Sequence, residues 1–332
     1  MNHKDIIVVG TSSGGLDALK ILVRDLPSGF PGSIFIVQHI AFDHQSVLAQ
    51  LISKAGALPA SFPSDYEKIN QGHIYVAPPD HHLLIENGFI RITRGPKENR
   101  FRPSIDALFR SAAYIYGPRV VGVVLTGMLD DGTAGLWAIK YRGGITIVQN
   151  PEEARASSMP KSALHSVEVD YCLRLKEIAP LLVQLTKTVV AQEGNYPVSE
   201  SMKIEVGIAK EKTAIDRGIQ NLFEPSVYTC PECHGVLLQI NEGESFRFRC
   251  HTGHAYSAGS LLKEGEEEIE DSLWAAVRSL EERIMLMWQF AENLEKRNRN
   301  GEAEVLVKKA RQAERQADQI RQILMTDVAE HL

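Results

Sequence analysis

The first half of the chain alternates short, uninterrupted apolar runs with amphipathic stretches, and this alternation most constrains the fold. The apolar runs that we expect to form strands are Ile6–Val9, Ser33–Val37, His73–Ala77, Val120–Leu125 and Gly144–Val148. Continuous apolar runs, separated by stretches with helical spacing such as residues 16–23, are typical of parallel strands buried on both faces. The sequence therefore predicts an α/β fold built on a doubly wound, mainly parallel sheet.

One segment departs from the parallel pattern. Leu83–Ile85 and Phe89–Ile92 flank Asn87-Gly88, a pair that favours a two-residue primed turn between antiparallel strands. We therefore expect a β-hairpin here. Further helices are expected at about residues 132–142 and 176–188.

Composition limits the classes of protein to consider. Hydrophobic residues make up 44% and charged residues 23% of the 332 residues, which is ordinary for a folded protein and argues against a disordered chain. Lysine plus arginine number 36 against 42 acidic residues, and the resulting net charge of −6 disfavours nucleic acid as a partner. No apolar run approaches the roughly 20 residues of a membrane helix. The run Ile6–Val9 is too short for a signal-peptide core, so we expect a cytoplasmic protein.

The C-terminal half is organised differently. A cluster of chain-breaking residues at 193–197 predicts a boundary, with an α/β domain over residues 1–190 and a linker over 191–228. A module containing cysteine and histidine follows at 229–260. Residues 261–332 carry two heptad stripes joined by a turn, which predicts an antiparallel helical hairpin. Its two helices either cover each other or offer a docking surface to a partner or a second subunit.

The loop Gly10-Thr11-Ser12-Ser13-Gly14 follows the first strand and fits the pattern G-x-S-x-G. Such a turn can expose its central serine beside helix N–H groups that stabilise an oxyanion. A glycine-rich turn at the start of a helix can equally hold a phosphate, although the lysine of a P-loop and the G-x-G-x-x-G spacing are missing. The loop alone leaves both interpretations open.

Two further strand ends supply the groups that a nucleophilic serine needs. His39 follows the second strand, and Asp130 and Asp131 follow the strand Val120–Leu125. Because sites in open parallel sheets form outside the carboxyl ends of the strands, these loops can converge into a Ser-His-Asp triad. The order serine, histidine, aspartate differs from that of α/β-hydrolases, whose serine also follows several strands, so that fold is disfavoured.

Five segments together resemble the catalytic domain of CheB-type chemotaxis methylesterases, over roughly residues 1–190. The segments are Val8–Gly15, Gln38-His39, Arg102–Phe109, Leu125–Met128 with Asp131-Gly132, and Met159-Pro160. The resemblance implies that Ser12 is the catalytic serine, with His39 as its base. It also implies that Asp131, rather than Asp130, is the acid of the triad.

Two neighbours of the triad enter through the same resemblance. Ser13 is expected to contribute a backbone N–H group to the oxyanion site, and Met128 matches a methionine implicated near the active site. One departure from the family is Leu129, which stands where a glycine is usual. Well-known members also carry an N-terminal receiver domain. Here the first strand begins at residue 6, so we expect no receiver, and we expect regulation to lie in the tail from about residue 192.

The resemblance implies a serine hydrolase that removes methyl esters from γ-glutamyl side chains of methylated, chemoreceptor-like coiled-coil proteins and releases methanol. Deamidation of particular glutamines is a second activity of such enzymes. No cofactor is implied for catalysis. The expected partners are that receptor, a methyltransferase or separate regulator, and a second subunit bound through the helical tail. Contact with a membrane is expected only through the receptor. The alternative is a non-catalytic or weakly catalytic signalling scaffold.

The cysteine module has the spacing of a metal site. Cys230-Pro231-Glu232-Cys233 and Cys250-His251-Thr252-Gly253-His254 flank an expected hairpin whose turn includes Asn241-Glu242-Gly243. Two such knuckles predict a zinc ribbon, because thiolates and imidazole suit tetrahedral zinc. The expected ligands of a structural zinc are Cys230, Cys233, Cys250 and His254, with His254 preferred over His251. Cys172 is expected in the core, and a metal-free module is the alternative.

Overall fold

The computed structural model describes residues 3–39, 46–190, 196–210, 218–219, 223–242 and 245–330. Residues 193–195 of the predicted breaker cluster and Gly243 of the expected ribbon turn lie outside these residues. The chain divides into two compact units, Met1–Leu261 and Leu262–Leu332.

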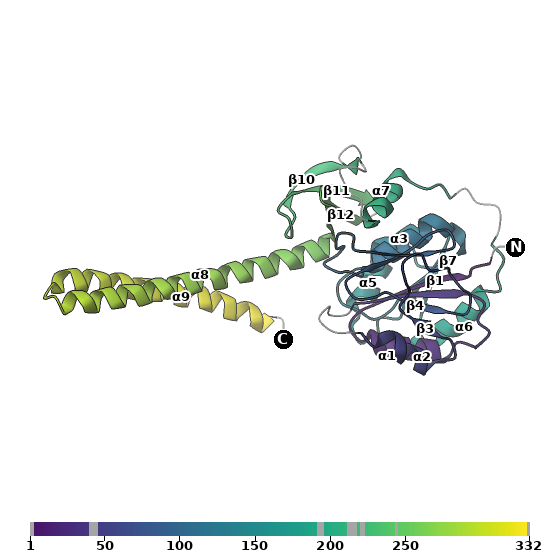
Figure 1. Ribbon diagram of the computed structural model, residues 1–332, viewed down its shortest axis with the longest axis horizontal. Coiled ribbons are helices and arrows are strands. Elements are labelled where there is room, and N and C mark those ends of the chain that lie inside the picture. Colours follow the sequence, from purple (N-terminus) through teal and green to yellow (C-terminus); the bar gives the residue numbers. More distant parts are fainter. Residues whose placement is uncertain are drawn as a thin grey trace. The chain divides into compact units, whose positions relative to one another are not determined.

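A seven-stranded parallel sheet forms the centre of the first unit (Figure 1). In spatial order its strands are β3 (Ala60–Ser61), β4 (Ile74–Val76), β2 (Ser33–Gln38), β1 (Ile6–Thr11), β7 (Val120–Val124), β8 (Ile145–Gln149) and β9 (Tyr171–Leu173). The parallel pairing confirms the α/β fold predicted from the apolar runs. The strand order reverses between β1 and β7, so the carboxyl ends of β1, β2 and β7 meet at the position where sites form in such sheets.

Helices cover both faces of this sheet (Figure 1). One face is covered by α1 (Gly15–Arg24), α2 (Leu48–Ala55) and α6 (Leu175–Leu185). The other face is covered by α3 (Ile105–Tyr116), α4 (Thr133–Tyr141) and α5 (Ser158–Ser166). A short 3₁₀ helix, Gly117–Arg119, joins α3 to β7. Because successive strand residues point to opposite faces, Val8 and Val9 enter different cores, and an uninterrupted apolar strand is required.

The predicted hairpin is present, but its turn differs from the prediction. Strands β5 (His82–Ile85) and β6 (Ile90–Thr93) pair antiparallel as a separate two-stranded sheet. Gly88 has a positive φ of 82°, whereas Asn87 is not among the residues with positive φ. Primed turns need positive φ at the first central residue, so the prediction of a primed turn is wrong.

The interval predicted as a linker contains a packed helix, α7 (Glu200–Ala209). The Ser199 side chain accepts a hydrogen bond from the Met202 N–H and caps the start of this helix. Met202 and Val206, one helical turn apart, are buried in the same core as α3. This helix is too short to show the long heptad pattern that predicts the two C-terminal helices, so the sequence alone does not indicate it.

The cysteine module forms a four-stranded antiparallel sheet within the first unit, which we call the ribbon. Its strands are β10 (Glu224–Thr229), β11 (Val236–Glu242), β12 (Ser245–Cys250) and β13 (Ala255–Ser257). The expected hairpin between the two cysteine pairs is therefore confirmed as β11 and β12. Cys172, by contrast, is exposed on β9 and is not a core residue.

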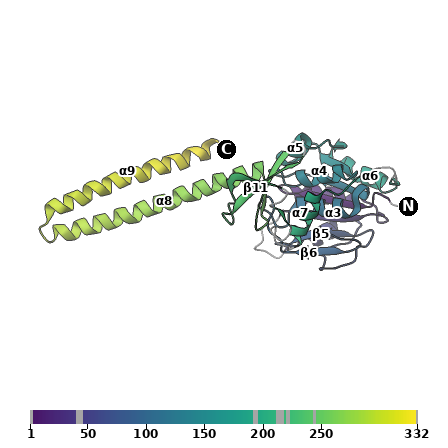
Figure 2. The same cartoon turned by 90° about the horizontal axis from the view of Figure 1, so that it is seen from above.

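The second unit consists of two antiparallel helices, as predicted (Figures 1 and 2). Helix α8 spans Ala258–Glu295 and begins within the first unit, and α9 spans Asn300–Glu330. Met287 packs against Ala310 and Ala313 at the interface between the helices. Large apolar side chains remain exposed elsewhere on α8, at Trp274, Met285, Leu286 and Phe290. Among the described residues, no helix combines the length and the apolar character that crossing a lipid bilayer demands.

Five buried charged side chains connect the ribbon to the α/β core. We call this group the buried charge cluster: Glu98, Arg110, Glu205, Arg247 and Arg249. Arg249 of β12 lies 3.0 Å from Glu98 and 2.9 Å from Glu205. Arg110 of α3 contacts the same two carboxylates, at 3.0 and 3.2 Å. The compact unit therefore extends past the boundary expected near residue 190, because the ribbon supplies two of the three arginines.

We expect Glu205→Gln to lower the free energy of unfolding by about 3–5 kcal/mol at pH 7, since removing one partner of a buried charge network leaves the others uncompensated. Burial opposes ionisation of Glu205, but Arg110, Arg247 and Arg249 hold its pKa well below the usual range. Its stabilising effect is therefore complete above the pKa of an unfolded glutamate, about 4.3, and is lost as the pH falls further.

Urea denaturation of the full chain between pH 3 and pH 7 measures this difference. Glu200→Gln is the matched control, because Glu200 lies on the same helix but is exposed and pairs only across the surface with Lys203. Equal effects of the two substitutions at pH 7 would contradict a stabilising role for the buried charge cluster.

Candidate active site

The turn after β1 presents Ser12 at the carboxyl edge of the sheet. The Ser12 N–H donates to the Thr126 carbonyl at 3.0 Å, and the Gln38 amide donates to the Ser12 carbonyl at 2.8 Å. A Cβ atom at Gly127 would lie 3.0 Å from the Ser12 Cβ, so a glycine is needed where the β7 loop passes the serine. Gly14, with φ of 78°, then starts α1.

His39 lies between Ser12 and Asp131. Its Nδ1 atom is 3.2 Å from Ser12 Oγ, and its Nε2 atom is 2.8 Å from Asp131 Oδ2. The ring stacks on Phe101, with centroids 3.6 Å apart and planes within 10°. Because a carboxylate only accepts hydrogen bonds, the ring proton lies on Nε2, and Nδ1 can accept from the serine hydroxyl. The three strand-end loops therefore converge as the sequence predicted.

The Asp131 carboxylate is fully buried and accepts several hydrogen bonds besides that of His39. The donors are Asn99 Nδ2 (3.0 Å), Ser104 Oγ (2.9 Å), and the backbone N–H groups of Ile105 (2.7 Å) and Asp106 (3.2 Å) at the start of α3. Burial opposes ionisation, but the bonds from His39, Asn99 and Ile105 hold the pKa of Asp131 below its usual range. The helix N-terminus adds to this stabilisation of the negative charge.

Asp130 points elsewhere. Its Oδ1 atom accepts from Ser257 Oγ of the ribbon at 2.7 Å, and burial raises its pKa. The preceding residue, Leu129, has φ of 61°, a left-handed conformation that explains why glycine suits this position. The structure thus places Asp131, and not Asp130, against His39.

Sequence reasoning missed several side chains around the triad. Asp106 accepts from the N–H groups of Gly132 and Gly135 at 3.0 and 2.6 Å, and burial, followed by the charge of Asp131, raises its pKa to about 7. Ser104 and Asp106 lie in the segment Arg102–Phe109, which contributes to the family resemblance but implies no role for either side chain. Asn99 and Phe101 lie in a loop whose sequence has no periodicity or motif, so no local signal marks them.

The two neighbours expected from the resemblance lie on the rim of the site. Ser13 is exposed and its carbonyl accepts from Thr126 Oγ1 at 2.9 Å. Met128 is 57% exposed. Ser12, His39 and Asp131 together form a nucleophile, a base and an orienting acid in hydrogen-bond contact, an arrangement suited to acyl transfer.

The ribbon gathers Cys230, Cys233, Cys250 and His254, whose ligand atoms all lie within 4.8 Å of one another. The Cys233 and Cys250 sulfurs are 3.6 Å apart, and His254 Nδ1 is 3.6 Å from the sulfurs of Cys230 and Cys250. A tetrahedron with metal–sulfur bonds of about 2.3 Å has edges of about 3.8 Å, so the spacing fits. His251 is not a member of this group and lies beside Gly235.

The second nitrogen of His254 gives a further reason to regard this group as a metal site. Its Nε2 atom lies 3.4 Å from the Glu232 carboxylate, while Nδ1 faces the three sulfurs. A carboxylate behind a histidine ligand fixes the ring and makes it a better donor to a metal. The donor set and its surroundings therefore fit a tetrahedral ion such as zinc.

Comparison with known proteins supports a hydrolase of one family. A family model described as CheB methylesterase matches residues 7–182. A Leptospira interrogans protein, provisionally named protein-glutamate methylesterase/protein-glutamine glutaminase, is 39% identical over 193 residues, which are 58% of this chain and all of that protein. A Thermotoga maritima protein with the same name is 34% identical over 184 residues, 54% of each chain. The solved catalytic domain of Thermotoga maritima CheB methylesterase aligns with a TM-score of 0.53 and 34% identity, covering 55% of this chain and 98% of that one.

The geometry makes a chemical prediction about the serine. A fluorophosphonate reagent should attach to Ser12 and not to Ser13, because only Ser12 contacts the His39 base. Asp131→Asn should slow labelling about 10³-fold or more, since the ring then loses its orienting carboxylate. Peptide mass spectrometry locates the adduct and measures its rate.

Asp130→Asn is the matched control for this experiment. An asparagine can still accept the hydrogen bond from Ser257, so the labelling rate should stay within the same order of magnitude as that of the unmodified chain. Equal slowing by the two asparagine substitutions would contradict the assignment of Asp131.

Proposed function

The chain belongs to the CheB methylesterase family, and we propose that it hydrolyses γ-glutamyl methyl esters on methylated, chemoreceptor-like proteins, with release of methanol. Deamidation of glutamines at equivalent positions is included in the proposal, because both reactions transfer the same glutamyl acyl group. The observation that carries it is the continuous hydrogen-bond chain from Ser12 through His39 to Asp131. The reaction requires no cofactor.

The proposed mechanism begins with attack of Ser12 Oγ on the ester carbonyl while His39 Nδ1 takes the hydroxyl proton. Asp131 holds the Nε2–H bond and stabilises the imidazolium that forms. The tetrahedral intermediate then expels the methoxy group, which receives the proton from His39 and leaves as methanol. Water, activated by the same nitrogen, releases the glutamate and restores Ser12.

The oxyanion of the intermediate needs donors close to Ser12. We assign this role to the Ser13 N–H group and to the positive end of α1, which begins directly after the loop. Met128, exposed on the rim, is assigned to contact with the substrate. Stabilisation of the oxyanion needs the backbone N–H group of Ser13 but not its hydroxyl group.

The proposed substrate is a methylated helix of a receptor-like coiled coil. The hydrolase chemistry is assigned to the α/β part, residues 1–190, and the helical tail to partners such as a regulator, a methyltransferase or a second copy. A cytoplasmic location, with membrane contact only through the receptor, is part of the same proposal. The scaffold alternative is disfavoured, because a protein without catalysis has no need of a connected triad.

We further propose that Cys230, Cys233, Cys250 and His254 hold one structural zinc ion. The tetrahedral spacing of the ligand atoms and the carboxylate behind His254 support this assignment. When bound, the ion would cross-link the two ends of the β11–β12 hairpin.

Methanol release from methylated receptor membranes tests the catalytic proposal. Ser12→Ala should lower the turnover rate about 10⁴-fold or more, since members of a triad act as a unit. Ser13→Ala is the matched control and should retain most of the activity, because its N–H group survives. A wild-type chain that binds the membranes but releases no methanol would favour the scaffold instead.

Metal analysis of full-length protein purified without added zinc tests the second proposal. We expect about one zinc per chain, with bonds of about 2.3 Å to sulfur and 2.0–2.1 Å to nitrogen by X-ray absorption. Cys250→Ser should lose the metal. Cys172→Ser, at the exposed cysteine outside the ribbon, should keep it, and metal-free wild-type protein would refute the assignment.

A further inference from the structure

The loop of residues 97–101 touches the triad on one side and the ribbon on the other. Phe101 stacks on the His39 ring, and Asn99 donates to Asp131. On the opposite side, the Asn99 N–H donates to the Ala255 carbonyl at 2.8 Å, and the Ala255 N–H donates to the Lys97 carbonyl at 3.2 Å. The loop thus forms an isolated parallel β-bridge with β13, between Glu98 and Ala255.

Both the NH₂ group and the oxygen of the Asn99 side-chain amide form hydrogen bonds. Its Nδ2 group donates to Asp131 Oδ1 at 3.0 Å and to Asp106 Oδ2 at 2.8 Å. Its Oδ1 atom accepts from the Ser257 N–H at 2.8 Å and from Ser260 Oγ at 3.3 Å. Since the two donors of the ribbon side occupy the oxygen, the NH₂ group must face the two carboxylates. The hydrogen bonds from the ribbon side therefore fix the orientation of the Asn99 amide.

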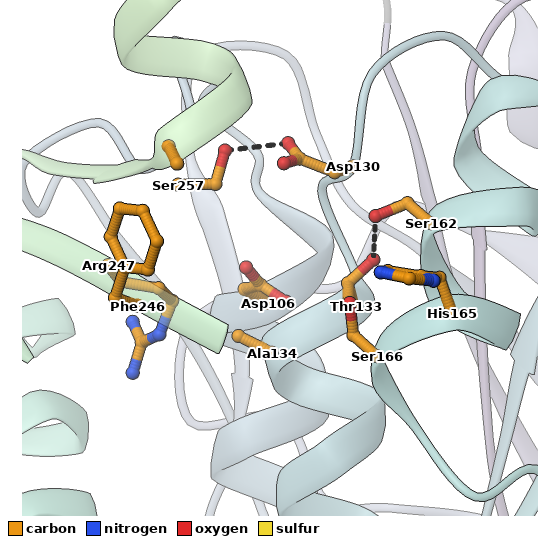
Figure 3. Close-up of a pocket in the computed structure, with 11 residues that line it drawn as sticks. Asp106, Asp130, Thr133, Ala134, Ser162, His165, Ser166, Phe246, Arg247 and Ser257 are labelled. Atoms are coloured by element: carbon orange, nitrogen blue, oxygen red, sulfur yellow. Dashed lines mark hydrogen bonds between the residues drawn. The ribbon is translucent and has the colours of Figure 1, made fainter. Parts of the chain in front are cut away.

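A second contact joins the ribbon to the same loop as the triad acid. Ser257 Oγ donates to Asp130, the residue directly before Asp131 (Figure 3). This contact borders a cavity of about 310 Å³, which is lined by residues of the ribbon and of the helices α4 and α5 (Figure 3). The Ser257 contact therefore adds to the Asn99 contacts and to the buried charge cluster in joining the ribbon to the active-site loops.

The buried charge cluster fixes the position of the loop of residues 97–101. Glu98, the neighbour of Asn99, contacts Arg249 of β12 and Arg110 of α3. Arg249 also donates to the Gly253 carbonyl at 2.7 Å, within the second cysteine knuckle. Two short segments, residues 97–101 and 249–257, therefore link the cysteine site to the buried charge cluster and to Asp131.

We propose that Asn99 is a positioning residue for Asp131, and that the ribbon, by fixing the Asn99 amide, makes the activity of the triad depend on the integrity of the cysteine site. This inference rests on the proposed esterase function. It means that loss of metal from the ribbon weakens catalysis through the Asn99 amide.

The pH dependence of the reaction reports on this link. The titratable groups that face Asp131 are His39, Asp106, Asp130 and His82, and Arg110 and Arg247 act on Asp106. Without the Asn99 donor, Asp131 binds a proton more readily, and a protonated Asp131 holds the His39 ring less firmly. This change moves the acidic limb of the kcat/KM profile, which belongs to the coupled pair, toward higher pH.

Asn99→Gly in the full-length protein tests the positioning role. Asn99 has φ of 51°, which glycine adopts without strain, so the substitution removes the amide and spares the backbone. The acidic limb should move up by about one pH unit, and kcat should fall about tenfold with KM little changed. An unchanged pH profile would overturn the proposal.

Two variants separate the amide from mere loop structure. Arg100→Gly is the matched control, because Arg100 also has a positive φ, of 74°, on the same loop, and its pH profile should stay unchanged. Asn99→Asp retains the acceptor for Ser257 but puts a third carboxylate beside Asp131 and Asp106, so it should shift the limb further than glycine does. A wild-type profile for Asn99→Asp would show that only the backbone matters.

The contribution of the ribbon is tested by a double-mutant cycle. Cys250→Ser should shift the acidic limb in the same direction, and combining it with Asn99→Gly should add little, since both act through one amide. If Cys250→Ser fails to fold, Ser260→Ala removes one donor to the amide and should give a smaller shift with the same lack of additivity. Gln239→Ala is the control, because the Gln239 side chain on β11 donates only to Asn241, in an exposed hydrogen bond. Additive shifts would overturn the link.

A spectroscopic measurement on isotope-labelled protein avoids dependence on activity. Treatment with a metal chelator should move the side-chain amide resonance of Asn99, and an unmoved resonance after zinc is lost would contradict the inference. Ser12→Ala keeps the two proposals apart. If Ser12→Ala retains methanol release, the proposed function fails. If it abolishes release while the Asn99 variants keep the wild-type profile, only the positioning role fails.

Discussion

The buried charge cluster is the interaction on which the rest of the first unit depends. Charges this deep are stable only when opposite charges surround them, and here the partners come from the loop before α3, from α3 itself, from α7 and from β12. The ribbon supplies two arginines and no carboxylate to the cluster, so these arginines depend on Glu98 and Glu205 outside the ribbon. The cluster therefore makes one compact unit from segments that look separate in the sequence.

The same cluster determines how the active site is supported. Glu98 is fixed by two arginines, and its neighbour Asn99 is thereby held between the ribbon and Asp131. The Asp131 carboxylate depends on donors from this loop and from the start of α3, which keep it ionised in a fully buried position. The triad is thus supported from outside the parallel sheet as well as from within it.

Sequence reasoning was effective wherever a signal is local. Uninterrupted apolar strands, the glycine-flanked Ser12 and the cysteine knuckles each reflect a rule that acts over a few residues, and the sheet, the serine turn and the ribbon hairpin follow from them. The wrong prediction of a primed turn at Asn87-Gly88 and the unpredicted helix α7 show where local signals are insufficient. A turn type depends on how the flanking strands twist, and α7 is held largely by partners distant in the chain.

The sequence by itself determined the α/β class, the helical hairpin, the family resemblance and the three side chains expected at the triad, because strand periodicity, heptads and motifs are properties of neighbouring residues. Only the tertiary structure decided that Asp130 faces Ser257, and that Asn99 joins the ribbon to the acid. These contacts join residues far apart in the chain. The burial that makes them strong exists only after the chain has folded, so no pattern along the sequence carries them.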